Sequence, residues 1–493
     1  MLEIDYKLRA CLFLFSITFI REKEMKLLVV LVGILFASNL QAENFTKCKD
    51  ADDFSELNLS ICATVKTSLS HKRESKEEIE LFVRKFPAQK SRTGSIWLIA
   101  GGPGESGASF YTLIDTFRNA FPSLDIFIPD HRGTGASSVI CPGEALDSVK
   151  AGTLVGQEWG ECFSHMYSNL EYVQAFNITN AAKDLNFLIN TFSGEGERYI
   201  YGVSYGTQLT LRAMQIGGNA VDGIILDSLV PMQDDTGFDL SMRSQVVNNV
   251  GQQFLSEYAR INNFSDEQLK NLKENLSRIT GKYKSIKKIS DSLPEAKLSN
   301  TLGMMLDVPH IRNIIPKIIN DISKNDSQSL EKAIQDLNTY YTNFNAGYFN
   351  YGSSIPLVQI ISASENNLRV ELSKEDIEKE SEGFLFSSPL PLLIAGNRMP
   401  TYKKDAYFSK LPAKLPKTLI MHGTLDPKTH FDAAKSYASV LNKAGDISLV
   451  SVEYAPHFVA LNAPDCFNQH AKEFIQGKAI KSQSCKDKKS IIK

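Results

Sequence analysis

The 493-residue sequence has almost no excess of either charge, with 54 Lys and Arg residues against 56 Asp and Glu residues. A protein that binds nucleic acid through its phosphates needs a basic surface, so this balance excludes that class of partner. The sequence also contains no internal repeat and no low-complexity segment, and its hydrophobic content of 43% is too high for a disordered chain. These absences leave a globular protein whose partners are small molecules or peptides.

No apolar run is long enough to cross a membrane as a helix. The two longest candidates, Ala10 to Ile20 and Leu27 to Phe36, each have about half of the roughly 20 residues that a spanning helix needs. The second run follows the basic residues Lys23 and Lys26 and is followed by ASNLQA, which ends in a small residue. This three-part pattern predicts a secretory signal peptide that is cleaved after Ala42.

Met25 is a more usual start for such a signal, and a start there would make residues 1–24 an extension upstream of the start codon. The alternative is a longer, uncleaved anchor. We therefore predict a leader over residues 1–42 and a periplasmic or secreted mature protein that keeps no stable membrane span after cleavage.

The cysteines have neither a C-x-x-C spacing nor the spacing of zinc ligands, so no metal site is predicted. Without Cys11, which lies in the leader, six of the seven cysteines remain, and six cysteines allow 15 pairings. The pairing that closes the shortest loops is Cys48–Cys62, Cys141–Cys162 and Cys466–Cys485. Three such disulfides agree with export, and the alternative is a set of separate buried thiols.

Short apolar runs bounded by turn residues predict a series of buried strands. They lie at residues 77–86, 95–100, 124–129, 198–203, 221–227, 418–423 and 447–454. Between them, the segment from Asn180 to Phe192 and the segment after Gly206 have the apolar spacing of helices. Strands that alternate with helical crossovers predict an α/β fold with a mostly parallel, doubly wound sheet.

The residue pattern changes between about residues 233 and 400, where polar, helix-prone segments replace the strand-like runs. We predict a helical cap inserted at 233–400, which divides the core into a first part at 43–232 and a second part at 401–493. The Lys-rich end of the chain, KDKKSIIK, is predicted to be a solvated tail.

One G-x-S-x-G motif occurs, with Gly202, Ser204 and Gly206 at the junction of the strand at 198–203 and the next helix. A serine held on a sharp strand-to-helix turn needs small neighbours, because its backbone is strained and adjacent segments approach closely. The motif predicts Ser204 as a nucleophile, with the backbone N–H of Tyr205 facing the developing oxyanion. The alternative is a glycine-rich turn that happens to contain serine.

A serine hydroxyl is a poor nucleophile unless a base takes its proton and a carboxylate orients that base. Of the eight histidines, His457 follows the strand predicted at 447–454, where a loop would present it. Asp426 comes directly after the strand at 418–423 and is the predicted acid, which gives the order Ser, acid, His that is typical of α/β-hydrolases. Asp227, at the end of an earlier strand, is the competing acid.

The oxyanion hole needs a second backbone donor from the loop after an early strand. The sequence there is Gly-Gly-Pro-Gly at residues 101–104, in which glycines permit close approach of the backbone. We predict that Gly102 and Tyr205 are the two donors. The alternative for the Gly-Gly-Pro-Gly motif, taken alone, is an ordinary turn.

These motifs together resemble the prolyl-aminopeptidase and tripeptidyl-aminopeptidase branch of the α/β-hydrolase serine peptidases. The resemblance rests on GGPGESG, DHRGTGAS, GVSYGTQL, HGTLDPKT and the late APH, and it covers residues 77–230 and 400–478. It implies the α/β-hydrolase fold with an inserted cap, no cofactor, and release of single residues or short peptides from N-termini by a Ser-His-Asp mechanism. The chain departs from the pattern at Ala100, where prolyl iminopeptidases usually have His.

An aminopeptidase must also recognise a protonated α-amine, which calls for a carboxylate near the acyl pocket. Glu105, beside the oxyanion loop, and Glu365, in the cap, are the candidates, and the alternative for both is a solvated surface charge. Arg132 is predicted to organise loops by hydrogen bonding and not to contact substrate.

Two other functions fit the same sequence. A secreted carboxylesterase or lipase would use the same triad on small acyl substrates, because the fold alone does not assign the substrate. A catalytically inactive binding protein on a hydrolase scaffold is the second alternative. The sequence does not indicate the oligomeric state.

Overall fold

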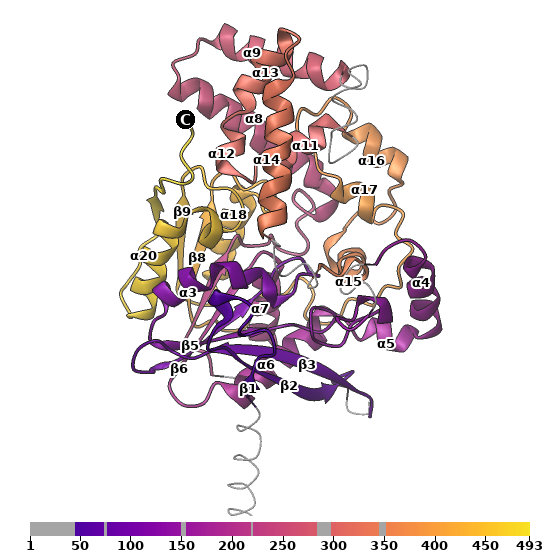
Figure 1. The fold of residues 1–493 in the computed structure, drawn as a ribbon, viewed down its shortest axis with the longest axis vertical. Helices are drawn as coiled ribbons and strands as arrows, with labels where there is room; N and C mark the ends of the chain where they lie inside the picture. The colour runs from indigo at the N-terminus through magenta and orange to yellow at the C-terminus, as the bar shows by residue number, and fades with distance from the viewer. Residues whose placement is uncertain (1–44, 73–75, 149–153, 218–219, 283–296, 345–351) are drawn as a thin grey trace, which may run out of the picture. The chain divides into compact units, whose positions relative to one another are not determined.

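The structure is a computed structural model that describes residues 45–72, 76–148, 154–217, 220–282, 297–344 and 352–493 (Figure 1). The chain divides into two compact units, Met1–Thr46 and Lys47–Lys493, and only Phe45 and Thr46 of the first are described. The predicted leader, residues 1–42, therefore lies outside the described residues. Within the described ranges, no helix has both the length and the apolar character that a membrane crossing requires.

The second unit is built on one large, mostly parallel sheet, as the sequence predicts. The strands are β1 (Thr46–Lys47), β2 (Ile61–Ser68), β3 (Glu78–Phe86), β4 (Gly94–Ile99), β5 (Leu124–Pro129), β6 (Glu197–Val203), β7 (Gly223–Asp227), β8 (Lys417–Gly423), β9 (Ile447–Val452) and β10 (Gln483–Cys485). From β2 onward their order is β2-β3-β5-β4-β6-β7-β8-β9-β10. Strand β3 pairs antiparallel with both β2 and β5, and the other pairs are parallel.

Helices cover both faces of the sheet. They are α3 (Ile114–Ala120), α4 (Glu158–Ser168), α5 (Leu170–Gln174), α6 (Ile178–Phe192), α7 (Tyr205–Ile216), α18 (Phe431–Leu441), α19 (Val459–Asn462) and α20 (Pro464–Ile475). In β4, Ile96 and Leu98 join an apolar cluster with Phe117 of α3, whereas Trp97 between them donates a hydrogen bond to Ser193 at the end of α6. Because alternate residues of a strand point to opposite faces, α3 and α6 lie on opposite sides of the sheet.

The long segment between β7 and β8 is helical and has an apolar core of its own. Its helices are α8 (Arg243–Ile261), α9 (Asp266–Lys282), α11 (Leu298–Met305), α12 (Pro309–Arg312), α13 (Ile315–Ser323), α14 (Gln328–Phe344), α15 (Ile355–Ile361), α16 (Lys374–Glu380) and α17 (Leu390–Ile394). Buried side chains such as Leu302, Ile318 and Ile334 pack these helices together. We call this segment the cap.

Short turns of helix connect these elements. They are the 3₁₀ turns η2 (Ser55–Leu57), η3 (Gly107–Leu113), η4 (Pro142–Glu144) and η5 (Leu240–Met242), and the π-helical turn η8 (Ser362–Asn366). The six cysteines other than Cys11 form three disulfides in the short-loop pairing, Cys48–Cys62, Cys141–Cys162 and Cys466–Cys485.

The C-terminal end of the chain is packed and not a solvated tail. Ile492 is 3% exposed and belongs to the apolar core of the cap. The guanidinium of Arg312 donates to the carbonyl of Ser490 at 3.0 Å, and the side chain of Asn313 donates to the carbonyl of Ile491 at 2.9 Å. The lysines of this segment predict a polar tail. Its apolar residue Ile492 packs against the cap instead, and the local sequence does not indicate this contact.

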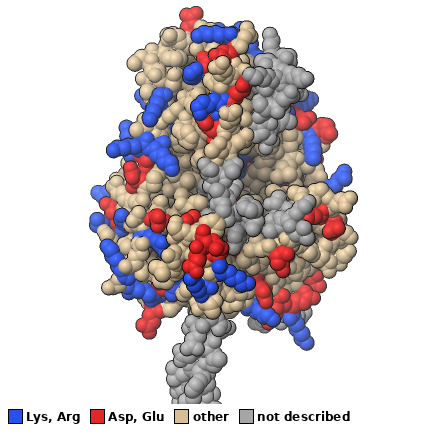
Figure 2. All heavy atoms as spheres, in the orientation of Figure 1, with Lys and Arg blue, Asp and Glu red and all other residues tan. Residues whose placement is uncertain are grey.

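Charges of both signs are interspersed on the face of the molecule shown in Figure 2. This distribution agrees with the formal net charge of −2. No wide field of one sign is seen on this face, so we look for charge preference in the individual residues that line a cavity.

Candidate active site

Ser204 lies at the turn between β6 and α7, in a conformation that residues with a side chain rarely adopt. Its φ is +55° and its ψ is −125°. A Cβ atom placed on Gly202 would lie 2.5 Å from the carbonyl oxygen of Gly206, and one placed on Gly206 would lie 2.2 Å from that of Ile99. Both positions therefore require glycine, and the strained turn is typical of a nucleophile elbow.

His457 follows β9 and contacts the carboxylate of Asp426, which follows β8. The two are joined by a hydrogen bond of 2.8 Å between Nδ1 and Oδ2. Asp426 also accepts the backbone N–H groups of Lys428 and Thr429 at 2.7 and 2.8 Å, and the Thr429 hydroxyl donates to its Oδ2. Burial by itself raises the pKa of this carboxyl, but the neighbouring His457 and these hydrogen bonds outweigh burial and hold the pKa of Asp426 well below its ordinary value.

A second histidine, His422, supports the turn that carries Asp426. The backbone N–H of Leu229 donates to its Nδ1 at 3.0 Å, so the ring proton sits on Nε2, which donates to the carbonyl of Thr429 at 2.5 Å. The same Nε2 lies 3.5 Å from Oδ2 of Asp426. Burial lowers the pKa of His422, which favours the neutral ring that this arrangement needs.

Asp227, the competing acid, has a different set of partners. Its two oxygens accept hydrogen bonds from the Tyr201 hydroxyl at 2.7 Å and from the backbone N–H groups of Val459 and Ala460 at 2.8 and 2.9 Å. It also accepts from the hydroxyl of Ser228. Asp227 therefore anchors the start of α19, directly after the histidine loop, while Asp426 makes the contact with the ring.

The glycine loop after β4 lies against Ser204. A Cβ atom placed on Gly101 would be 3.1 Å from Cβ of Ser204. Gly102 has a φ of +107°, and a Cβ there would lie 2.3 Å from the backbone nitrogen of Gly104. Tyr205 is the first residue of α7, where backbone N–H groups have no acceptor within the helix. The two predicted oxyanion donors thus stand on segments that both adjoin Ser204.

Buried charged groups hold this loop and its neighbours in place. Asp130 accepts hydrogen bonds from the Ser106 hydroxyl and the Gly107 N–H, both at 2.7 Å, and so fixes the far end of the glycine loop. Arg132 forms a bidentate ion pair with Asp184, with hydrogen bonds of 2.6 and 2.8 Å, and also donates to three backbone carbonyls. Arg132 organises loops, as predicted.

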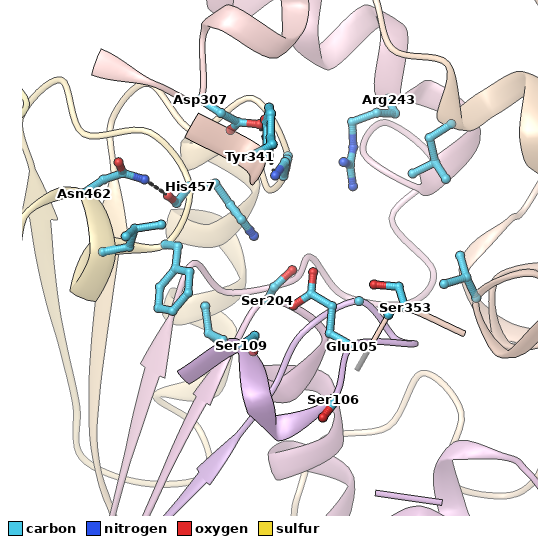
Figure 3. A pocket seen from close by; sticks show the side chains of 18 of the residues that line it. Glu105, Ser106, Ser109, Ser204, Arg243, Asp307, Tyr341, Ser353, His457 and Asn462 are labelled. Atoms are coloured by element: carbon cyan, nitrogen blue, oxygen red, sulfur yellow. Dashed lines mark hydrogen bonds and ion pairs between the residues drawn. The ribbon is translucent and has the colours of Figure 1, made fainter. Parts of the chain in front are cut away.

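Ser204 and His457 line the same cavity, which has a volume of about 600 Å³ (Figure 3). The core contributes Gly102, Glu105 and Phe458 to its wall, and the cap contributes apolar and charged side chains. The cap residues with side chains in the wall include Leu240, Arg243, Asp307, Tyr340, Tyr341, Val358 and Leu390. Ser204 therefore faces a space that both parts of the unit enclose.

The two predicted amine-binding carboxylates lie in different places. Oε2 of Glu105 is 3.3 Å from the point that a Cβ on Gly101 would occupy, and Cβ of Ser204 is 3.1 Å from the same point. Glu365 does not line the cavity: it is 2% exposed and forms a 2.7 Å ion pair with Arg212. The structure thus brings Glu105, and not Glu365, close to Ser204. Glu365 neutralises a buried guanidinium instead.

Three charged residues of the cavity wall were not found from the sequence. Nζ of Lys428 pairs with Asp307 of the cap at 3.1 Å, and Arg243 points into the cavity from the start of α8 (Figure 3). For Lys428, the only indication in the sequence is its position two residues after Asp426. Nowhere in the described ranges do three or more His, Cys, Asp or Glu side chains gather in a way that could hold a metal ion.

Comparison with known proteins gives one broad match and several distant ones. The family described as "alpha/beta hydrolase fold" matches residues 95–464. The "Putative hydrolase YuaR" of Escherichia coli (strain K12) is 28% identical over 162 residues, a match that spans only 32% of this chain and 32% of that protein.

Two solved structures illustrate the distant similarities. A thermophilic esterase from Thermogutta terrifontis is 15% identical, with 84% of this chain and 98% of that chain covered and a TM-score of 0.36. Epoxide hydrolase I of potato (Solanum tuberosum) is 13% identical, with 85% and 99% covered and a TM-score of 0.36. Similarities of this strength say nothing about the substrate of this chain.

Proposed function

The chain belongs to the alpha/beta hydrolase fold family, and from that premise we propose that it is an exported serine aminopeptidase, which releases N-terminal residues or short peptides through an acyl-enzyme on Ser204. Support comes from the strained elbow at Ser204, the hydrogen bond between His457 and Asp426, and the cavity that Ser204 and His457 share. The three disulfides and the predicted signal peptide support export to an oxidising compartment.

In this mechanism the hydroxyl of Ser204 attacks the substrate carbonyl while Nε2 of His457 takes its proton. Asp426 accepts the Nδ1–H of the ring, so it selects the tautomer that leaves Nε2 free to act as a base. The N–H groups of Gly102 and Tyr205 stabilise the oxyanion. His457 then gives the proton to the leaving amine as the C–N bond breaks, and water hydrolyses the acyl-enzyme by the same steps in reverse.

The position of Glu105 is the observation that carries the preference for a free amine. A carboxylate this close to Ser204 attracts a protonated amine, and this attraction is stronger in a cavity with reduced access to water. A neutral ester has no group that needs such a partner. We therefore assign to Glu105 the binding of the substrate α-ammonium group.

The test compares tripeptide p-nitroanilides that have a free α-amine with the same compounds acetylated at that amine. We expect kcat/KM to be at least tenfold higher for the free amine, and Glu105→Gln to reduce this ratio strongly. Glu267→Gln, at an exposed site on α9, is the matched control and should keep the wild-type ratio. Rapid hydrolysis of p-nitrophenyl esters with no cleavage of any free-amine peptide amide would overturn the peptidase proposal.

A carboxylesterase is the second candidate, because the apolar part of the wall, including Leu240, Val358 and Leu390, also suits an acyl chain. The esterase function makes a different prediction for Glu105→Gln. Removal of the carboxylate by Glu105→Gln should leave ester turnover equal to or higher than that of the wild type if neutral acyl esters are the natural substrates.

A further inference from the structure

Arg243 stands in the cap wall of the cavity that contains Ser204. It is the first residue of α8, and its side chain is half-buried. Figure 3 shows its guanidinium pointing into the cavity from the cap, while Glu105 points into it from the glycine loop. A cation thus faces the space in which a bound substrate would lie.

The backbone N–H of Arg243 donates to the carbonyl of Leu240, but its guanidinium has no hydrogen-bond or ion-pair partner among the described residues. This sets it apart from the other arginines in the interior. The fully buried ones all donate to a carboxylate or to backbone carbonyls: Arg84 to Asp50, Arg132 to Asp184, Arg212 to Glu365, and Arg312 to Tyr454 and Ser490. A guanidinium removed from much of the solvent without a counter-ion is costly unless a ligand supplies one.

Asp426 and Asp307 act on Arg243 electrostatically, but neither forms a hydrogen bond or an ion pair with its guanidinium. In the cap wall, Oδ2 of Asp307 is paired with Nζ of Lys428 at 3.1 Å, and its Oδ1 has no hydrogen-bond partner. Glu105 lies at Ser204, on the glycine loop. The planar fork of a guanidinium binds a carboxylate through two parallel hydrogen bonds, a geometry that a water molecule or an amide cannot match.

We propose that Arg243 binds a carboxylate of the substrate, and that this residue makes the enzyme selective for acidic peptides or for short peptides whose C-terminal carboxylate reaches the cavity. This inference rests on the proposed role of Ser204 as the nucleophile. Together with Glu105 it makes the cavity dipolar: the ammonium group of the substrate binds beside Ser204 and its carboxylate binds at the cap wall.

The test uses pairs of substrates that differ only in one charge. Short peptides are compared with Glu or Gln at each internal position, and with a free or an amidated C-terminus, so that the two sources of a carboxylate are separated. We expect kcat/KM to be at least tenfold higher for the anionic member of one pair. In Arg243→Met, which keeps much of the side-chain volume, that ratio should fall to about one. Arg243→Lys should retain part of it, because the charge remains but the fork is lost.

Arg278→Met, at an exposed position of α9, is the matched control and should keep the wild-type ratio. A wild-type enzyme that shows no preference for the anionic member of any pair would overturn the proposal. An Arg243→Met variant that is folded and keeps the full preference would overturn it as well.

A pair of esters separates failure of this inference from failure of the peptidase proposal. The p-nitrophenyl monoester of glutaric acid and p-nitrophenyl pentanoate have acyl chains of equal length, and only the first carries a carboxylate. If peptides are not cleaved but esters are, the aminopeptidase proposal fails, and the ratio for this pair still tests Arg243. A ratio above ten that is lost in Arg243→Met supports the carboxylate site, and a ratio of one or below contradicts it.

Discussion

The ring of His457 donates its Nδ1 hydrogen to Oδ2 of Asp426 across 2.8 Å. Asp426 is fully buried, and its other oxygen accepts two backbone N–H groups, so the carboxylate cannot rotate away from the ring without losing several hydrogen bonds. The orientation of the His457 ring therefore depends on the turn after β8. This turn is itself held by His422 through the carbonyl of Thr429.

The two buried aspartates should respond differently to the same substitution. Asp426→Asn should lower kcat by about 10³- to 10⁴-fold with little loss of stability, because the amide no longer fixes the ring tautomer. Asp227→Asn should instead reduce the free energy of unfolding by about 2 kcal/mol, since it loses an acceptor for the backbone of α19. Urea unfolding and steady-state kinetics on both variants check this. An inactive, stable Asp227→Asn beside an active Asp426→Asn would reverse the assignment.

Gly102→Ala should disrupt the oxyanion loop. The added Cβ would lie 2.3 Å from the nitrogen of Gly104 at a φ of +107°, so the loop must move. We expect kcat for the amide substrate to fall about 10²- to 10³-fold with a smaller change in KM, because the N–H of Gly102 is used mainly in the transition state. Gly156→Ala is the control, since Gly156 also has a positive φ but no atom within 4 Å of the added Cβ. Equal kinetic effects in the two variants would argue against the oxyanion role.

Glu144 should make stability depend on pH. It accepts a hydrogen bond from Ser354 at 2.5 Å, and the backbone N–H of Ser354 in turn donates to the carbonyl of Gly104, so this contact links the cap to the glycine loop. Burial raises the pKa of Glu144 from 4.5 to about 7. Between these two values the folded protein binds the proton and the unfolded chain does not, so stability should fall as pH rises through that window.

Glu144→Gln removes this titration. The variant should be more stable than the wild type at pH 8, by up to about 3 kcal/mol, and should differ little from it at pH 4. Urea unfolding at several pH values measures the difference, with Glu161→Gln on the surface of α4 as the control. A difference that is the same at pH 4 and pH 8 would contradict the raised pKa.

The candidate site residues that follow strands could be predicted from the sequence. The carboxyl ends of parallel strands meet at one edge of the sheet, so local motifs after β6, β8 and β9 are enough to suggest that Ser204, Asp426 and His457 come together. The parallel sheet could be predicted for a similar reason, because strands buried on both faces appear as continuous apolar runs.

The charges of the cavity could not be predicted in this way. Arg243 and Asp307 reach the cavity through the packing of cap helices, which depends on contacts between residues far apart in the chain. The buried ion pair of Glu365 could not be predicted because its partner, Arg212 on α7, is 153 residues away in the sequence. The buried C-terminal segment around Ile492 was missed for the same reason, since its partners lie in the cap.

Reaction of the folded protein with a fluorophosphonate, followed by peptide mass spectrometry, tests the central claim most directly. This reagent is attacked by an activated serine hydroxyl and forms a stable adduct on it. We predict a single adduct on Ser204 and none in Ser204→Ala that is folded to the same extent. Ser106 and Ser109 also line the cavity and serve as internal controls. No adduct on the folded wild type, or an adduct on either of those serines instead of Ser204, would contradict the account.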